Sequence, residues 1–205
     1  MPDVLVPVAR WSRWLTNFEA SHGTAMLVVD GGALRGTAPD GSWFAARLPF
    51  SRSYDGLPDP TALADAATAP DLWGALLVRK GGFAIARVVG GAVVDSKVGQ
   101  RHVQGRTKAG GQSQQRFARR RGNQAREAYA AAADHAARIL SGVALVAAGG
   151  DRAAVTEVLA DPRLASVSVV GPWFAVPDPR RAVLDRVVGD AQALVVEVEN
   201  AQASQ

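Results

Sequence analysis

Pairs of adjacent glycines divide this chain into short hydrophobic runs, and this spacing limits the folds that the chain can adopt. The runs between the early pairs are rich in valine, isoleucine and aromatic residues and have the length of ordinary strands. Glycine at their junctions supplies the positive φ that tight hairpin turns require, so we predict antiparallel strands joined by short turns. The glycine pairs stand at 31–32, 81–82, 90–91, 110–111 and 149–150, and the expected strands at 25–29, 34–37, 43–48, 75–79, 83–89 and 92–97.

The other hydrophobic patterns indicate helices and a change of strand order. The final third of the chain alternates strand and helix, which produces parallel strands. We therefore predict an α/β fold with a mixed sheet, in which an antiparallel meander is followed by βαβα. Residues 194–198 fit either an edge strand or more of the last helix. The expected helices are 8–21 (with the stripe Val8, Trp11, Leu15 and Phe18), 61–67, 113–140, 153–160 and 179–188, and the later strands are 143–148 and 165–170.

The composition excludes several kinds of site. Because the chain has no cysteine, it has no disulfide, no thiolate nucleophile and no cysteine-bound zinc. Its three histidines lack the spacing of metal ligands, so we expect no metal and no cofactor. No apolar run approaches the roughly 20 residues that span a bilayer, and the N-terminus has no signal-peptide pattern. We expect a soluble, cytoplasmic monomer with no membrane partner.

The glycine pairs also raise the alternative of a nucleotide-binding loop. Such a loop needs G-x-G-x-x-G spacing between a strand and a helix. The pairs at 81–82 and 90–91 lie between expected strands, where they serve turns. The pair at 149–150 does precede a helix, but no further glycine, lysine or acidic partner accompanies it. We interpret all three as turns.

One segment carries the positive charge of the chain. Between Ser96 and Arg126 there are nine basic residues and no acidic one, whereas the whole chain has a formal net charge of only +4. Such concentration favours a polyanionic partner. A solvated helix face is the alternative, but such faces usually mix the two signs at neighbouring turns.

Gly110-Gly111-Gln112 lies inside this basic segment. It ends a glycine-rich stretch, 98–112, which we expect to be a loop that is poorly ordered in the free protein, and it precedes the long helix. Three residues alone are a weak motif. The twelve residues from Gly110 to Arg121, GGQSQQRFARRR, extend the match. They resemble the GGQSxxRFARxR signature in the middle domain of eukaryotic and archaeal class-1 release factors.

The resemblance covers about residues 72–191 and implies the fold of that middle domain, which is RNase H-like, with a long helix after the GGQ loop. The codon-reading signatures of those release factors are absent from this sequence. The chain therefore resembles the stand-alone Vms-type release-factor-like domain, a family of peptidyl-tRNA hydrolases, in its actinobacterial branch. Lys108-Ala109 departs from the Gly-Arg usual before the motif.

The resemblance also implies a division of the chain into three parts. Residues 1–70 would be an N-terminal extension of helix, hairpin and connector, and we expect it to pack on the main domain because the apolar stripe of its helix needs a partner. Residues 71–191 would be the catalytic domain, and 192–205 a C-terminal edge or tail.

The implied function is ribosome-dependent hydrolysis of peptidyl-tRNA, which releases nascent peptide from stalled large subunits in ribosome-associated quality control, independently of stop codons. The implied partners are the large ribosomal subunit and peptidyl-tRNA. Two alternatives stay open: cleavage of the tRNA near its 3′ CCA end, and a non-catalytic module that binds the ribosome or RNA. The expected catalytic residues are Gly110, Gly111 and Gln112, and the expected RNA-binding residues are Arg101, Arg106, Lys108, Arg116, Arg119, Arg120, Arg121 and Arg126.

Overall fold

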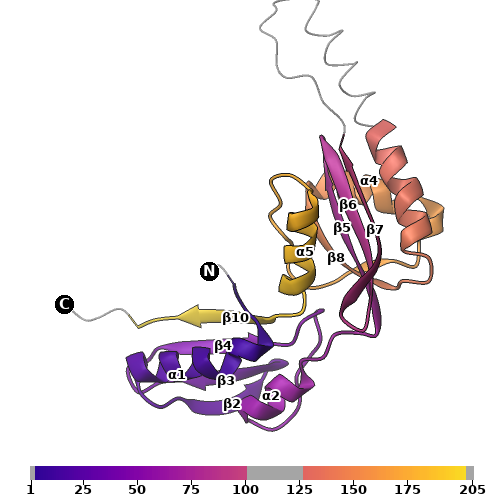
Figure 1. Cartoon of the computed structure of the whole chain (residues 1–205). Coiled ribbons are helices and arrows are strands. Elements are labelled where there is room, and N and C mark those ends of the chain that lie inside the picture. Colours follow the sequence, from indigo (N-terminus) through magenta and orange to yellow (C-terminus); the bar gives the residue numbers. More distant parts are fainter. Residues whose placement is uncertain (1–2, 101–126, 202–205) are drawn as a thin grey trace, which may run out of the picture. The chain divides into compact units, whose positions relative to one another are not determined.

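The computed structural model describes residues 3–100 and 127–201. The chain divides into two compact units: unit 1 is Met1–Ala69 with Val188–Gln205, and unit 2 is Pro70–Val187. The polypeptide thus begins in unit 1, builds unit 2, and returns to unit 1 for its last strand (Figure 1).

Unit 1 is an antiparallel sheet covered by two helices on one face. Its strand order is β1-β10-β4-β3-β2, and every neighbouring pair is antiparallel. The last strand, β10, therefore lies inside the sheet. The elements are β1 (Val4–Val6), η1 (Val8–Arg10), α1 (Trp11–His22), β2 (Met26–Asp30), β3 (Ala33–Thr37), β4 (Trp43–Arg47), α2 (Pro60–Ala66) and β10 (Leu194–Glu199).

The core of unit 1 forms because the hydrophobic stripe of α1 packs on the sheet of the same unit. Trp11 and Phe18 from this stripe are buried and contact the ring of Phe44 edge to face, with ring centroids 5.8 Å and 5.1 Å away. Burial of each such side chain stabilises the fold by about 1.5–3 kcal/mol. Gly36 allows this packing, since a Cβ there would lie 2.3 Å from a Phe44 ring carbon.

Unit 2 contains the mixed sheet that the sequence predicts. Its order is β7-β6-β5-β8-β9; the first three strands form an antiparallel meander, and β5–β8 and β8–β9 are parallel pairs. The alternation of strand and helix after residue 143 is confirmed. The elements are β5 (Leu72–Arg79), β6 (Gly82–Val89), β7 (Ala92–Gln100), helical residues 127–139, β8 (Leu145–Gly150), α4 (Arg152–Leu159), η2 (Pro162–Leu164), β9 (Ser168–Val169) and α5 (Arg181–Asp190).

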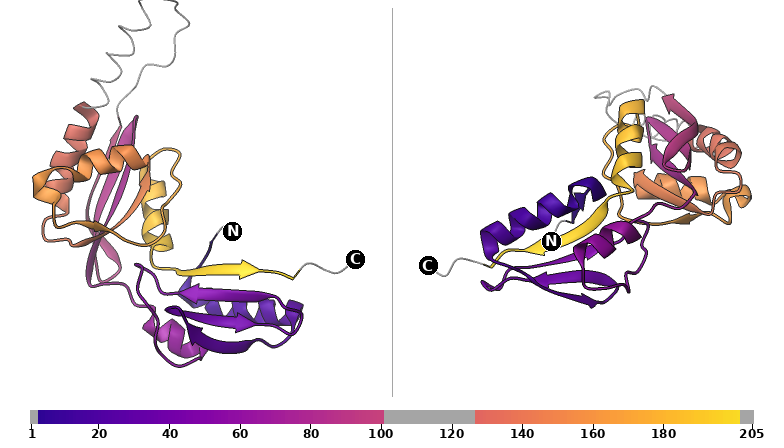
Figure 2. Two further views of the ribbon diagram at one scale, coloured as in Figure 1. Left: turned by 180° about the vertical axis from the view of Figure 1, so that it is seen from behind. Right: turned by 60° about the horizontal axis from the view of Figure 1, so that its bottom comes forward.

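Helices cover both faces of this sheet. The helix at 127–139 and α4 pack on one face, and α5 lies over the other (Figures 1 and 2). The first face is lined from the sheet by Leu76, Ile85 and Val146 and from the helices by Tyr129, Ala132, Ala136, Ile139 and Val155. Ala132, Ala133 and Ala136 of the 127–139 helix are buried against this face.

Several expectations differ from the structure. There are two five-stranded sheets, whereas we predicted one. Strand β7 continues to Gln100, so the first three residues of the expected loop 98–112 are strand; the rest of that loop lies outside the described residues, as does 113–126 of the expected helix. Strand β9 is only Ser168–Val169, because the preceding residues turn: the Ala165 N–H donates to the Pro162 carbonyl and the Val167 N–H to the Leu164 carbonyl. Residues 194–198 belong to an interior strand and not to an edge or tail.

The division at residues 70 and 191, the packing of residues 1–70 on the main domain and the RNase H-like assignment remain predictions. The expectation about packing rested on the need of the α1 stripe for a partner, and the sheet of unit 1 itself meets that need.

Candidate functional site

All the residues that the sequence predicts to act lie outside the described residues. They are Gly110, Gly111 and Gln112, and the cations Arg101, Arg106, Lys108, Arg116, Arg119, Arg120, Arg121 and Arg126. The structure describes the two elements that flank them, β7 and the helix at 127–139. We call the end of unit 2 where β7 finishes and this helix begins the base of the segment. Both ends lie on the same side of unit 2 (Figures 1 and 2).

Strand β7 is held on both of its faces. Asp95 accepts a 2.9 Å hydrogen bond from Arg138, at the end of the helix on one face. The next residue, Ser96, accepts a 3.1 Å hydrogen bond from Arg181 of α5. Consecutive residues of a strand point to opposite faces, so these contacts fix the strand from two sides. The exposed ion pair between Arg138 and Asp95 contributes no more than about 1 kcal/mol to stability. Its main effect is to fix the position of β7 relative to the helix.

An aromatic contact joins the end of β7 to the returning helix. Gly99 pairs with Phe83 across the antiparallel register, and the Phe83 ring covers the glycine so closely that a Cβ would lie 2.5 Å from it. The same ring contacts the His135 imidazole, with centroids 5.5 Å apart. Phe83 is buried in the core of unit 2. Gly99, Phe83 and His135 therefore link the strand that enters the segment to the helix that leaves it.

The glycine pair at 149–150 lies at the same end of the sheet and serves close packing. A Cβ on Gly149 would lie 2.6 Å from the Phe174 carbonyl oxygen, and one on Gly150 would lie 2.3 Å from that of Val78. Asp151 caps α4 by accepting a hydrogen bond from the Ala153 N–H. A carboxylate thus occupies the position that a bound phosphate would need. The prediction of a turn at this pair is wrong, because both glycines end strand β8, but the crowded backbone and the Asp151 cap support the absence of a nucleotide-binding loop.

Near the base of the segment, the pKa of the Tyr129 side chain is shifted by its environment. Burial, and then the carboxylates of Asp151 and Glu157, raise the pKa of its phenol above the ordinary value of 10. The phenol therefore stays protonated at neutral pH and does not act as a general base.

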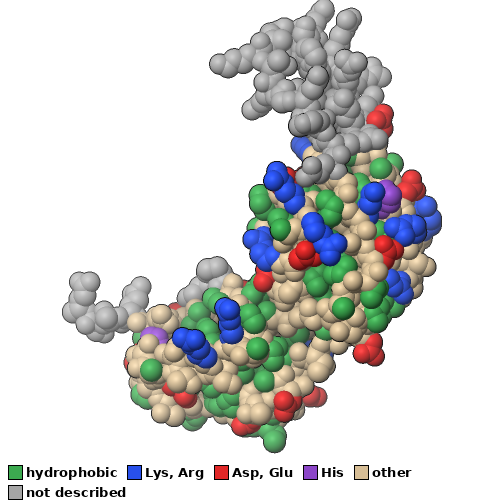
Figure 3. Space-filling view, viewed as in Figure 1, with side chains coloured by type: hydrophobic (Ala, Val, Ile, Leu, Met, Phe, Trp, Pro, Cys, Tyr) green, Lys and Arg blue, Asp and Glu red, His purple; other side chains and the backbone are tan. Residues whose placement is uncertain are grey.

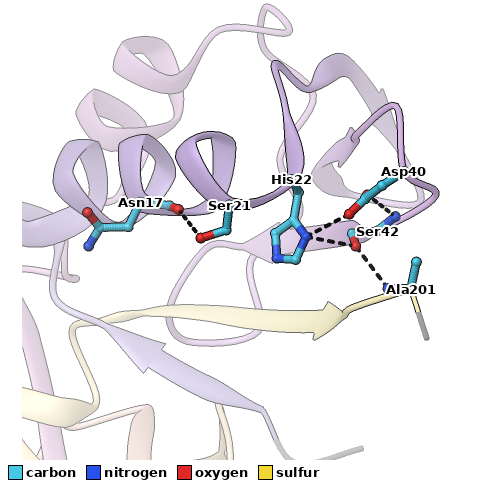
Figure 4. Close-up of polar contacts among 6 residues, drawn as sticks. All are labelled: Asn17, Ser21, His22, Asp40, Ser42 and Ala201. Carbon is cyan, nitrogen blue, oxygen red and sulfur yellow. Dashed lines mark hydrogen bonds and ion pairs between the residues drawn. The ribbon is translucent and has the colours of Figure 1, made fainter. Parts of the chain in front are cut away.

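A Ser–His–Asp group that the sequence analysis missed lies in unit 1 (Figure 4). His22 Nδ1 is 2.8 Å from Asp40 Oδ2 and 3.1 Å from Ser42 Oγ. In a hydrolase triad the carboxylate and the serine use different ring nitrogens. Here both contact Nδ1, and Ser42 is fully buried, so the group cannot activate a nucleophile. No recognisable spacing marks these three residues in the sequence.

The contacts of this group show a structural role instead. Ser42 Oγ accepts a 2.8 Å hydrogen bond from the Ala201 N–H, and the Ser42 N–H donates to Asp40 at 2.8 Å. That backbone donor first, and His22 second, lower the pKa of the Asp40 carboxyl below its ordinary 3.8. The group thereby fastens the end of α1 and the chain after β10 to the turn between β3 and β4.

A metal-ligand cluster and a membrane-spanning helix are both absent from the described residues. Among residues 3–100 and 127–201, no group of three or more His, Cys, Asp or Glu side chains is placed to hold a metal ion. In the same residues, no helix has the length and apolar content needed to cross a membrane.

An α/β unit whose antiparallel meander leads into a GGQ-bearing segment, and whose helix then returns to the sheet, fits the release-factor class. The chain belongs to the family described as the Actinobacteria/chloroflexi VLRF1 release factor, whose model matches residues 71–197, more than half of the chain. The match confirms the resemblance seen in the sequence, and it extends through β5 to β10. Membership implies a release-factor-like domain, an interaction with the ribosome and a role in releasing stalled nascent peptides. No curated protein matches the chain.

Proposed function

We propose that this protein hydrolyses the ester between the nascent peptide and tRNA on stalled large ribosomal subunits, independently of a stop codon. The observation that carries the proposal is the sequence Gly110–Arg121, which matches the release-factor GGQ signature and lies inside the family match 71–197. Water attacks the ester carbonyl and the bond between the carbonyl carbon and the ribose oxygen breaks: the peptide leaves as a carboxylate, the ribose oxygen takes a proton and becomes a free hydroxyl, and one proton is released.

The three motif residues have distinct roles in this proposal. Gly110 and Gly111 lack a Cβ, so their backbone can enter a crowded RNA site in conformations closed to other residues. The Gln112 amide and backbone N–H orient the attacking water and stabilise the developing charge on oxygen. RNA and the tRNA ribose supply the proton route. This is consistent with Tyr129, whose raised pKa keeps it from acting as a base near the segment.

The cations on either side of the motif provide affinity. Arg101, Arg106 and Lys108 precede it, and five more arginines follow (Arg116, Arg119, Arg120, Arg121 and Arg126). Contacts between such side chains and phosphates position a protein on RNA without reading sequence. The base of the segment supports this placement because β7 is held on both faces and joined to the helix through Phe83.

The substitution Gln112→Ala tests the proposal. Because it removes one amide and no charge, binding to large subunits that carry peptidyl-tRNA should persist. Peptide release should fall by roughly ten- to a thousandfold if the amide orients water in the transition state. Release is measured with purified large-subunit nascent-chain complexes, and binding by co-sedimentation. The matched control is Gln115→Ala, which removes the same amide three residues along the chain.

Normal release by the Gln112→Ala variant would contradict the proposal and favour a non-catalytic binder. Sequencing the 3′ end of the tRNA released by the unaltered protein separates the two reactions. An intact CCA end is expected from ester hydrolysis, whereas a shortened end would show cleavage of the tRNA.

A further inference from the structure

Unit 1 carries a groove that the proposed release activity does not use. It has a volume of about 500 Å³ and lies between β1 and the first half of α1. One wall is apolar and comes from Val4–Val6 and Pro7. The other comes from the helix side and presents Arg10, Arg13, Trp14 and Asn17. Figure 3 shows cationic side chains beside hydrophobic ones over the α1 region. These residues lie outside the family match at 71–197.

The strand in this groove has an open edge. β1 is the first strand of the sheet and pairs with β10 on one side only. Backbone N–H and C=O groups on its other side can accept a further strand, as in β-strand addition. Val4 is 41% exposed, so apolar surface accompanies this free edge. The edge and the apolar wall together fit an extended peptide.

The charge of the groove fits an acidic peptide. Arg10 and Arg13 are exposed, and neither forms an ion pair with any carboxylate among the described residues. Asn17 adds an amide that can bond to a peptide backbone. Two unpaired guanidinium groups beside an apolar wall complement carboxylates that alternate with aliphatic side chains along a strand.

The aromatic floor of the groove argues against RNA as the occupant. RNA bases bind such surfaces by stacking on an exposed ring face. Trp14 already stacks with Trp11 at 5.4 Å and with Phe18 at 5.7 Å, with interplanar angles of 13° and 14°. Trp14 also contacts Phe44 edge to face at 5.3 Å, so three aromatic neighbours within the protein already occupy much of this half-buried ring. An aliphatic side chain can still pack against the remaining ring edge.

We propose that this groove binds an extended acidic segment of a partner protein, which adds a strand to β1. Its aliphatic side chains would pack on Val4 and the edge of Trp14, and its carboxylates would pair with Arg10 and Arg13. The surface is an attachment site for a partner, separate from the chemistry of the 101–126 segment.

Defined peptides test this proposal with the full chain. The probes are an acetylated hexapeptide of alternating glutamate and valine, its lysine–valine counterpart, and a hexauridylate. NMR titration should show amide shifts at Val4–Val6 and along the first half of α1 with the acidic peptide, and weaker binding of the other two. The double substitution Arg10→Glu/Arg13→Glu should weaken the acidic peptide by about tenfold or more. The same variant should bind the lysine peptide better than the unaltered protein does.

The matched control is Lys80→Glu/Lys97→Glu, which makes the same change in net charge at exposed residues of unit 2. This variant should bind the acidic peptide with little change. The proposal is overturned if no shift appears at Val4–Val6 at millimolar peptide, if both double variants lose affinity equally, or if the oligonucleotide binds more tightly than the acidic peptide. Because none of these measurements involves release, their failure leaves the proposed hydrolysis untouched.

Discussion

Because Gly99 has no Cβ, one aromatic ring can pack directly on β7 and also contact the helix at 127–139. The Phe83 ring covers it, and that ring is also held by His135 and by the core of unit 2. Since the ring is buried, it cannot swing away to admit a side chain without opening a gap in the core. A displacement of the Phe83 ring at Gly99 would therefore also disturb its contact with His135 of the helix at 127–139.

We predict that Gly99→Ala destabilises the protein and reduces peptide release. The new Cβ would lie 2.5 Å from ring carbons of Phe83, and overpacking of this kind costs about 1–3 kcal/mol. Release should fall because the two ends of the segment shift relative to each other. Chemical denaturation measures the stability change, and the nascent-chain assay measures release.

A second substitution separates crowding from other effects of this change. Phe83→Leu removes ring atoms, so the Gly99→Ala/Phe83→Leu double variant should show a favourable coupling energy in a double-mutant cycle. The control is Gly189→Ala in α5, where the added Cβ would meet no atom within 4 Å other than the neighbouring backbone of its own helix. Additive effects of Gly99→Ala and Phe83→Leu would show that the predicted crowding does not exist.

Sequence reasoning succeeded at residues whose role is local. Glycine pairs at 31–32 and 90–91 were predicted as turns because hairpin geometry demands positive φ there, and both residues of each pair have positive φ in a turn. The pair at 81–82 is one residue out of register with its turn, which is Lys80-Gly81, because Gly82 begins β6. Gly99 was assigned to a loop, because its function depends on a ring that lies opposite it on another strand. The His22, Asp40 and Ser42 group was missed for the same reason: its members meet only after α1 and the sheet have packed.

At the scale of elements, the amphipathic helix α1 and the meander β5–β7 were predictable because their hydrophobic patterns depend only on residues close together in the sequence. β10 was ambiguous for the opposite reason. Its residues pair with strands far away in the sequence, as in the register Val196↔Ala46, and local periodicity carries no trace of such partners. The base of the candidate site was likewise foreseeable only in part, since the order strand, segment, helix was predicted but the two-sided fixation of β7 was not.

Arg163 forms a clamp between η2 and the helix that leaves the segment. Its guanidinium donates to Asp161 at 2.7 Å and to Asp134 of the helix at 2.6 Å. The Arg163 side chain first, and its backbone N–H second, lower the pKa of the Asp161 carboxyl to about 2 from its ordinary 3.8. This pair of contacts ties the middle of the 127–139 helix to η2. The contact between Arg163 and Asp161 depends on an ionised Asp161 carboxylate.

We predict that Asp161→Asn removes part of the acid dependence of stability. The folded-state pKa is lower than the unfolded one, so the ionised carboxylate stabilises the fold fully above about pH 4. That contribution disappears as the pH falls towards 2. The stability difference between the unaltered protein and the variant should therefore be largest above pH 4 and shrink below it. Chemical denaturation at several pH values measures this difference.

Asp65→Asn is the control for loss of one negative charge, because this exposed carboxylate forms no ion pair within residues 3–100 and 127–201. Its effect on the pH dependence should be smaller than that of Asp161→Asn. If both substitutions gave the same pH profile, the clamp would have no special role.

On the scale of the whole molecule, unit 2 is an insertion within unit 1. The chain completes the first sheet only after unit 2 has been built, when β10 enters between β1 and β4. The family match runs from residue 71 to residue 197, so it takes in all of unit 2 except Pro70, and also the first four residues of β10 in unit 1. Folding of unit 1 thus requires contacts between the two ends of the sequence, which makes its formation non-local.

The positive charge of the molecule is concentrated in one segment of the chain. Nine basic residues and no acidic residue lie from Ser96 to Arg126, within a chain that has 23 basic and 19 acidic residues. The remainder is therefore net acidic. A polyanion such as ribosomal RNA would be attracted to one segment and repelled by much of the rest, which favours a single orientation of binding.

We predict that the triple substitution Arg116→Ala/Arg119→Ala/Arg120→Ala weakens association with large subunits that carry peptidyl-tRNA and flattens its dependence on salt. Each phosphate contact that is lost lowers the slope of log affinity against log salt by about one, so the slope should fall by up to about three. Association is measured at several salt concentrations. The control replaces Arg35, Arg47 and Arg180, which make the same change in net charge outside the segment and should leave the slope unchanged. If the first variant retained both affinity and slope, the three arginines would form a solvated helix face, and the affinity for RNA would have to come from other residues.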